Sequence, residues 1–494
     1  MSANAGTIDS VGIMQADLTK HPKGLYVLFG AEMWERFSFY SMLALFTLYL
    51  QNAEEGFGWA RNDATRLYSY YLAAVYFSPL IGGWIADRKL GYRRSVIIGG
   101  LFFMAGHLLL SFRSVEVMYL ALFCLVVGNG FFKPNVSAMV GKLYPEGSHL
   151  KDRAFNIFYM GINVGAFLAP LVMEAVRSSI GYHAAFAVAA AGMLVSVGIL
   201  VLFKRHIENV DEGTGAGARM AVAEDTSAVT GNEPQASLTA VDAPPIDESV
   251  GAEKTDKPRR NLIDSISDNK RIGALIVVFL IVIVFWMAFH QNGSTWTYWA
   301  NDNTDWTASA VVPFLVKILT LGIVSSEDIS GVISNAINPF WVIVLTFPLI
   351  GFWSWLDKKG LEPSTPAKMG IGMFLVSAAY LIMYQAALAG GNTGRVSPWW
   401  LITAYAVITL GELMLSPMGL SLVSKVAPIR LRGVMMGGWF AATSIGNYLV
   451  GTIGVQWTVW SHSKFFLVIA AMCAAIGVIL FAILRPLKKA MPGV

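Results

Sequence analysis

The chain has 494 residues, of which 55% are hydrophobic and 14% are charged, and its formal net charge is +4. Soluble globular proteins average about 25% charged residues, so the composition excludes that class and predicts an all-α polytopic membrane protein. The small positive charge comes from lysines and arginines in loops that set topology, so it says little about partners. These basic loops are short, and we expect no nucleic-acid partner.

Twelve apolar segments have the length of about 20 residues that crosses a bilayer. A polar stretch at 1–23 precedes them, which predicts a cytoplasmic N-terminal tail and no signal peptide. Segment 308–323 is short for a span and contains Lys317, so we predict an outside-facing loop there, where an interfacial helix could form. The predicted spans are 25–50, 69–86, 95–112, 117–139, 154–175, 183–203, 272–297, 333–356, 367–389, 399–424, 433–456 and 464–485.

The spans divide into two groups of six, separated by a polar gap. We predict an N-terminal bundle at 24–203, a C-terminal bundle at 272–485 and a cytoplasmic tail at 486–494. The linker at 204–271 is rich in Gly, Ala, Ser, Thr, Pro and acidic residues at 206–260, a composition that cannot bury a core. We therefore expect it to be largely disordered, and a regulatory role for it remains an alternative.

Basic residues in the loops predict the orientation. Cytoplasmic loops carry an excess of Lys and Arg, and the loop "DRKLGYRR", which begins with Asp87 and Arg88, has four basic residues. A similar excess of Lys and Arg lies between spans ten and eleven and at the C-terminus. These three basic segments predict that both termini are cytoplasmic. A related "LDKKG" follows span eight, and two six-helix halves that repeat in this way are typical of the major facilitator arrangement.

The first span contains three charges within "GAEMWERFSFY". Glu32, Arg36 and Tyr40 are spaced by four residues and share one helix face, with Glu35 beside them. A charge inside a bilayer is costly and normally faces a cavity or a partner. A structural ion pair is the alternative, but a third charge exceeds what one pair needs, so this stripe is a candidate site.

Three further polar residues lie inside predicted spans. Lys133 is either a cation facing a cavity or a lysine that extends towards the interface. Glu412 has no basic neighbour in its own span, which suits a proton or amine site; the alternative is an acid paired with a hydroxyl. His290 could relay protons, since histidine titrates near neutral pH, or it could simply form a hydrogen bond.

Motifs of enzyme chemistry are not found in the sequence. It has no phosphate-binding loop, no zinc-ligand spacing around its two cysteines and no GxSxG, and it lacks the nucleotide-binding domain of an ATP-driven pump. We expect a secondary transporter driven by an ion gradient, with no metal or cofactor.

Seven motifs resemble those of the proton-dependent oligopeptide transporter family, also called POT or PTR2, within the major facilitator superfamily. The resemblance extends through both halves, roughly 24–203 and 272–485, and includes the first-helix pattern ExxERFxYY. The motifs in this chain are "EMWERFSFY", "GGWIADRKLGYRRSVIIGG", "FNIFYMGINVGAF", "GFFKPNVS", "FWMAFHQNGS", "SNAINPFW" and "LGELMLSPMGLS".

This resemblance implies a 12-helix major facilitator fold that imports di- and tripeptides together with protons. By the same resemblance, Arg36, Lys133 and Tyr40 would hold the peptide carboxylate, and Glu412 would hold its ammonium group. Glu32, Glu35 and His290 would take part in proton coupling, and Asp87 and Arg88 in conformational change at the cytoplasmic loop. The remaining implied residues are Asn163 and Asn338 at the peptide N-terminus, and Tyr76, Phe39, Trp286, Ser416 and Trp439 lining the pocket.

The sequence departs from the family pattern at several points. Phe39 replaces the penultimate tyrosine of the first motif, His290 stands where many relatives carry an acid, and 204–271 has no apolar run for extra helices. Two rival functions remain: a family relative that carries nitrate, hormones or amino-acid-like compounds, and a sensor that binds peptides without transport. We expect a monomer in a lipid bilayer, the bacterial inner membrane.

Overall fold

The computed structural model of the protein describes residues 20–144, 150–211 and 266–491. Within these ranges twelve helices have 18 residues or more, and no β-strand is present. The twelve long helices are α1 (Lys23–Gln51), α2 (Arg61–Ile85), α3 (Tyr92–Leu109), α4 (Val115–Lys142), α5 (Leu150–Ser179), α6 (Tyr182–Leu202), α9 (Asp268–Phe289), α12 (Ser334–Lys358), α13 (Thr365–Gly390), α14 (Pro398–Val426), α15 (Arg432–Gly454) and α16 (His462–Ala482).

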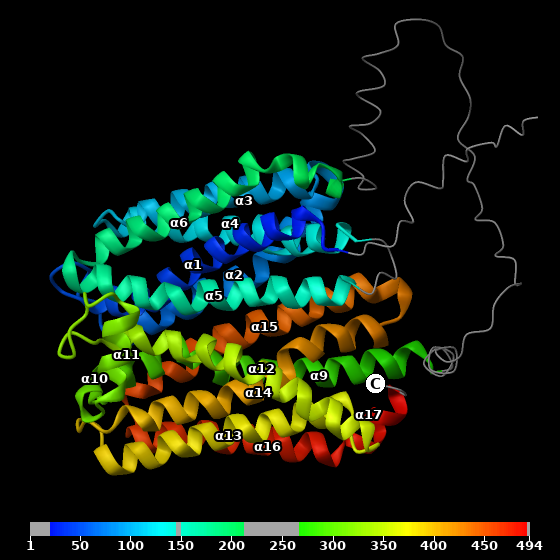
Figure 1. Ribbon diagram of the computed structural model, residues 1–494. Helices are drawn as coiled ribbons and strands as arrows, with labels where there is room; N and C mark the ends of the chain where they lie inside the picture. Colours follow the sequence, from blue (N-terminus) through cyan, green and yellow to red (C-terminus); the bar gives the residue numbers. More distant parts are fainter. Residues whose placement is uncertain (1–19, 145–149, 212–265, 492–494) are drawn as a thin grey trace, which may run out of the picture.

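The long helices form two bundles of six, which lie side by side in Figure 1. Helices α1–α6 make one bundle, and α9 with α12–α16 makes the other, packed against the first through α2 with α15 and α5 with α12. Within the described residues, eight helical segments are long and apolar enough to cross a membrane. Helix α1 is outside this group because Glu32, Glu35 and Arg36 interrupt its apolar sequence.

Helix boundaries lie within four residues of the predicted spans except at the second, where α2 begins eight residues earlier, and at the seventh. The span predicted at 272–297 is present within Asp268–Asp302, but it is not one regular helix. Helix α9 ends at Phe289, a short 3-10 helix covers His290–Gly293, and α10 (Thr295–Asp302) follows. Polar side chains satisfy the backbone at this break, since Thr47 of α1 donates to the Gly293 carbonyl at 3.3 Å. The break coincides with a polar run in the sequence, His290–Gly293, inside an otherwise apolar segment.

The segment 308–323 does not cross the membrane. Its helix, α11 (Val311–Leu319), has nine residues, which reach about 14 Å against about 30 Å of hydrocarbon. Short 3-10 helices lie on either side, at Trp306–Ala308 and Gly331–Ile333. At the chain's end, α17 (Leu484–Ala490) occupies most of the predicted tail. Most of the predicted linker, 212–265, lies outside the described residues.

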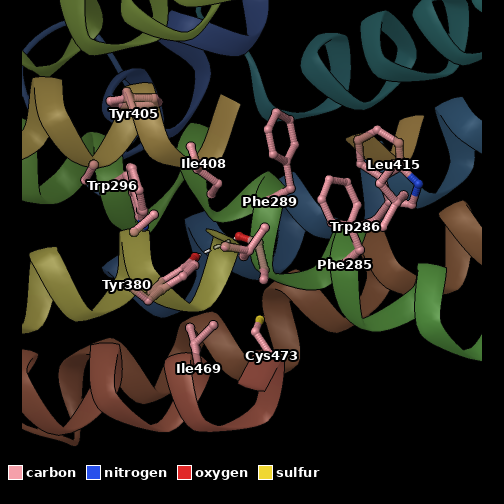
Figure 2. Close-up of a cluster of buried hydrophobic side chains, with 14 of the residues drawn as sticks. Phe285, Trp286, Phe289, Trp296, Tyr380, Tyr405, Ile408, Leu415, Ile469 and Cys473 are labelled. Atoms are coloured by element: carbon pink, nitrogen blue, oxygen red, sulfur yellow. Dashed lines mark hydrogen bonds between the residues drawn. The ribbon is translucent and has the colours of Figure 1, made fainter. Parts of the chain in front are cut away.

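The core of the C-terminal bundle is rich in aromatic side chains. Figure 2 shows Phe285, Trp286 and Phe289 of α9 beside residues of α13, α14 and α16. The Tyr380 hydroxyl of α13 donates to the Ala288 carbonyl at 2.7 Å, drawn as a dashed line in the figure. This core fixes α9, and therefore the position at which the helix breaks.

Polar contacts between the two bundles gather at one end of the described molecule. We call it the distal end: it carries α10 and α11 and lies opposite the C-terminus in Figure 1. There Arg61 of α2 forms an ion pair with Asp302 of α10 at 2.7 Å. Nearby, Glu174 of α5 accepts hydrogen bonds from the backbone N–H and the hydroxyl of Ser330, at 2.5 and 2.8 Å. These bonds join the two bundles at the distal end.

Two glycines allow the helices that carry the central charges to approach closely. A Cβ on Gly165 of α5 would lie 2.2 Å from the Met33 carbonyl oxygen and 3.2 Å from Cβ of Arg36, both in α1. A Cβ on Gly82 of α2 would lie 1.9 Å from the Gly130 carbonyl oxygen of α4. The first contact sets the position of Arg36, and the second brings α4 against α2 near Lys133.

Replacing Gly165 with valine is expected to destabilise the protein by overpacking this crossing, by about 1–3 kcal/mol. The measurement is the thermal unfolding midpoint of the purified protein in detergent. Gly198→Val is the matched control, since a Cβ there meets no atom within 4 Å. Equal unfolding midpoints for the two variants would contradict the role assigned to Gly165.

Candidate functional site

The three charges of α1 form one buried cluster. Arg36 bonds the Glu35 carboxylate through two of its nitrogens, with Nη2 2.7 Å from Oε1. Its Nε also lies 3.1 Å from Oε1 of Glu32, one helical turn earlier. All three side chains are at most 3% exposed. The planar guanidinium suits such paired contacts, and among the described residues Oε2 of Glu32 has no hydrogen-bond partner.

Lys133 of α4 adds a second cation to this cluster. Its Nζ lies 4.5 Å from the ring centre of Tyr76 in α2, the geometry of a cation–π contact. It also interacts electrostatically with Arg36, Glu32 and Glu35. The side chain therefore points into the bundle towards α1, which favours the cavity-facing alternative over a lysine that extends to the interface.

Glu412 of α14 is held by side chains of its own bundle. The amide of Asn338 in α12 donates to Oε2 of Glu412 at 2.9 Å and to Oγ1 of Thr409 at 2.9 Å. The Asn338 amide can reach both acceptors because Thr409 and Glu412 lie three residues apart on one face of α14. This arrangement leaves Oε1 of Glu412 available to a further donor.

Two tyrosines connect the charges of the two bundles. Tyr40 of α1 interacts electrostatically with both Arg36 and Glu412. Tyr76 of α2 does the same, and it also interacts with Tyr40. Both tyrosines therefore lie within electrostatic range of the cationic group of the N-terminal bundle and of the acid of the C-terminal bundle.

His290 lies where α9 ends, in contact with both bundles. Its Nδ1 is hydrogen-bonded to Oδ1 of Asn447 in α15. Its ring stacks on Trp286, with ring centres 4.8 Å apart, and lies 5.4 Å from the ring of Tyr76. The simple hydrogen bond that was the alternative for His290 is thus present. The ring also lies near Tyr76 and interacts electrostatically with Lys133.

The other predicted residues lie in different settings, and not all of them are near the central charges. Asn163 of α5 donates to the Tyr159 carbonyl of its own helix at 2.9 Å. Phe39 is 2% exposed and lies under the Arg36 guanidinium, 5.0 Å from its Cζ. Trp439 of α15 covers Gly419 of α14, whose absent side chain makes room for the indole ring. The remaining three are Ser416, whose side chain lies outside the described part of α14, and Asp87 and Arg88, which are exposed in the π-helical turn Ala86–Leu90 after α2.

Several residues of the site escaped the sequence analysis. Asn447 gave one signal, as a polar residue inside an apolar span, but its pairing with His290 depends on how α15 packs against α9. Tyr159 interacts electrostatically with Glu412 and Tyr40. Glu174 and Arg177, three residues apart in α5 and paired at 2.9 Å, could have been recognised as charges on one helix face.

Comparison with known proteins places this arrangement among transporters. The model described as "PTR2: POT family" matches residues 93–479. A "Di-/tripeptide transporter" of Lactococcus lactis subsp. cremoris is 31% identical over 96% of this chain and 97% of the relative. The "Peptide transporter YePEPT" of Yersinia enterocolitica subsp. palearctica is 32% identical over 96% of each chain.

Solved structures agree with these sequence matches. A crystal structure of a "peptide transporter POT in complex with sulfate" superposes with a TM-score of 0.78 and 28% identity, covering 96% of this chain and 97% of that one. A crystal structure of a mutant "peptide transporter POT" in complex with alafosfalin gives the same TM-score, identity and coverage. Together with the two bundles of Figure 1, these matches identify a 12-helix major facilitator fold and a multi-pass membrane transporter.

Proposed function

Since this chain belongs to the POT family, we propose that it is a proton-coupled symporter that imports di- and tripeptides by alternating access. The observation that carries this proposal is the convergence of opposite charges from the two bundles. Arg36 and Glu412 each interact with Tyr40 and Tyr76. A zwitterionic peptide needs a cationic contact at one end and an anionic contact at the other.

Recognition at the two ends would leave the peptide side chains unspecified. We assign the peptide carboxylate to Arg36 and Lys133, with Tyr40 as a further donor, and the ammonium group to Glu412, with Asn338 and Asn163 in support. The gap between the charged ends would limit length, at roughly 3.3–3.6 Å for each residue of extended peptide. The tolerant walls would be Tyr76, Phe39, Trp286, Ser416 and Trp439.

Proton coupling is assigned to the carboxylates that compete for Arg36. With both ionised, Glu32 and Glu35 occupy the Nε and Nη2 atoms of its guanidinium. Protonation of Glu32 would weaken that competition, so that a peptide carboxylate could pair with Arg36, and proton and peptide would then move together. The unpartnered Oε2 of Glu32 is a place where such a proton could reside. His290 is a further candidate for the proton route.

Alternating access would require the two bundles to separate at the distal end. We assign that end to the outside and the opposite end, with Asp87 and Arg88, to the cytoplasm. Both termini would then be cytoplasmic, and the protein would reside in the bacterial inner membrane as a monomer, with protons as the coupling ion and no other cofactor. The basic loop residues and the bacterial relatives support this orientation and location.

Uptake into liposomes tests the proposal directly. Purified protein in liposomes is expected to accumulate labelled dialanine when the lumen is more alkaline than the medium, and to lose accumulation when a protonophore removes the gradient. Protein-free liposomes provide the control. Binding of dialanine without accumulation would instead support a sensor that does not transport.

Competition separates the peptide proposal from its rival within the family. An excess of unlabelled dialanine is expected to suppress labelled dialanine uptake, whereas nitrate at the same concentration leaves it unchanged. A simple anion could use Arg36 and Lys133 but has no group for Glu412. Uptake of labelled nitrate that dialanine does not affect would overturn the assignment of peptides as the substrate.

A further inference from the structure

One face of α11 is apolar and uncovered in the described part of the protein. Val311, Phe314, Leu315 and Ile318 are spaced by three and four residues, so they share this face, and they are between 48% and 61% exposed. Leu321 and Ile323 extend it beyond the helix, with exposures of 89% and 54%. In a chain that spans a membrane, a group of exposed apolar side chains on one face of a short helix is suited to contact with lipid.

The opposite face of α11 holds the helix in place. Val312 and Val316 are buried in the hydrophobic core of the C-terminal bundle. Thr320 is buried as well, and its hydroxyl donates to the Val316 carbonyl at 2.7 Å. The helix is thus docked on the protein along one side, and the apolar face is turned outwards by this docking.

The turn after α11 carries the apolar face beyond the helix. Leu321 adopts a left-handed conformation with φ of 54° and is followed by Gly322 at 81°, while the Gly322 N–H caps the helix on the Lys317 carbonyl at 2.6 Å. A bulky side chain is disfavoured in that conformation, where glycine is the usual residue. The side chain of Leu321 is nevertheless 89% exposed, so the turn adds a large apolar group to the surface that α11 presents.

The chain before α11 is tied to the expected boundary of the membrane. Val396 exchanges backbone hydrogen bonds with Asn303 and Asp305, at 2.9 and 2.8 Å. Two residues later α14 begins, and its first turn exposes Trp399 and Trp400. Tryptophans gather at the level of the lipid headgroups, so these backbone bonds hold the start of α11 close to that level at the distal end.

We propose that α11 and the turn after it lie flat in the boundary between lipid headgroups and acyl chains, with the apolar face in contact with lipid. A helix of nine residues cannot cross the bilayer, but an apolar face with Lys317 at its flank suits an interfacial position. This contact goes beyond the proposed transport function.

The lipid contact concerns the distal end as well, because α11 lies in the chain between two residues that bond the N-terminal bundle there. Asp302, the partner of Arg61, precedes it, and Ser330, the partner of Glu174, follows it. The segment that supplies both contacts from the C-terminal bundle is therefore anchored between them in the membrane surface.

Spin labelling in liposomes tests this placement. Single cysteines at positions 314 and 318 of the full chain would carry a nitroxide, with Ser326, exposed in the same loop, as the aqueous control and Leu467, exposed on α16, as the lipid control. Native Cys124 and Cys473 are buried, so wild-type protein measures background labelling. The readout is the relative collision rate with oxygen, which enriches in lipid, and with a water-soluble nickel chelate.

We expect the ratio of oxygen to nickel collisions at 314 and 318 to resemble that at 467 and to exceed that at 326 several-fold. A ratio equal to that at 326 would place the face in water and overturn the proposal. Low collision rates with both reagents, together with spin–spin broadening between labelled molecules, would show that a second copy covers the face and would overturn it equally. Neither result would affect the proposed transport function, which is measured separately by uptake.

Discussion

Replacing Glu32 with glutamine is expected to abolish the accumulation of dialanine driven by a pH gradient, while exchange of labelled for unlabelled dialanine persists. The glutamine keeps the size of the side chain but cannot exchange a proton, so it no longer alternates between competing for Arg36 and releasing it. Binding and movement of the peptide itself do not need that step. The measurement is uptake into liposomes under a gradient, compared with counterflow at equal pH on both sides.

The matched control for this prediction is Glu116→Gln. Glu116 is an acid in the first turn of α4 and lies outside the charge cluster, so both modes of uptake should match those of the wild type. A Glu32→Gln protein that still concentrates dialanine would refute the coupling assigned to this residue. Loss of both modes would also contradict it, because Glu32 would then be needed for peptide binding or folding.

Replacing Glu412 with glutamine is expected to weaken the recognition of peptides that have a free N-terminus. A hydrogen bond to a charged group contributes about 1.5–3 kcal/mol, so the apparent affinity for dialanine should fall by about 10- to 150-fold. N-acetyl-dialanine has no ammonium group, and its weak inhibition should change little. The measurement is the concentration of each unlabelled compound that halves the uptake of labelled dialanine. The labelled dialanine is kept at the same low concentration for the wild type and the variant.

Glu327→Gln provides the control for the C-terminal half, because Glu327 is exposed in the loop between α11 and α12. The discrimination between the two compounds should remain at the wild-type level in this variant. If Glu412→Gln weakened both compounds to the same extent, Glu412 would serve the structure of the site and not the ammonium group. Asn338 and Thr409, which bond one another beside Glu412, would then be the next residues to vary.

Much of the fold follows from local sequence properties, and the reason is physical. Lipid offers no partner for backbone polar groups, so each crossing must be a helix of about 20 apolar residues, and hydropathy reveals it. For the same reason the charges at Glu32, Arg36 and Glu412 are conspicuous in the sequence. The polar run His290–Gly293 is visible in the sequence, but a run of four residues does not say whether the helix continues through it, because that depends on partners such as Thr47 of another helix.

The sequence by itself determined that twelve spans exist, that acids and bases lie within the lipid region, and which motifs indicate a family. Only the tertiary structure decided which of those groups meet: Arg36 with both neighbouring glutamates, Lys133 with Tyr76, and His290 with Asn447. It also decided that the two bundles are bonded at the distal end, through Glu174 and Ser330. The positions of the spans depend on local composition. In contrast, Lys133 and Tyr76, His290 and Asn447, and Glu174 and Ser330 are 57 to 157 residues apart in the chain, and packing between helices brings them together. The pairing of Arg36 with its neighbouring glutamates depends on side-chain rotamers.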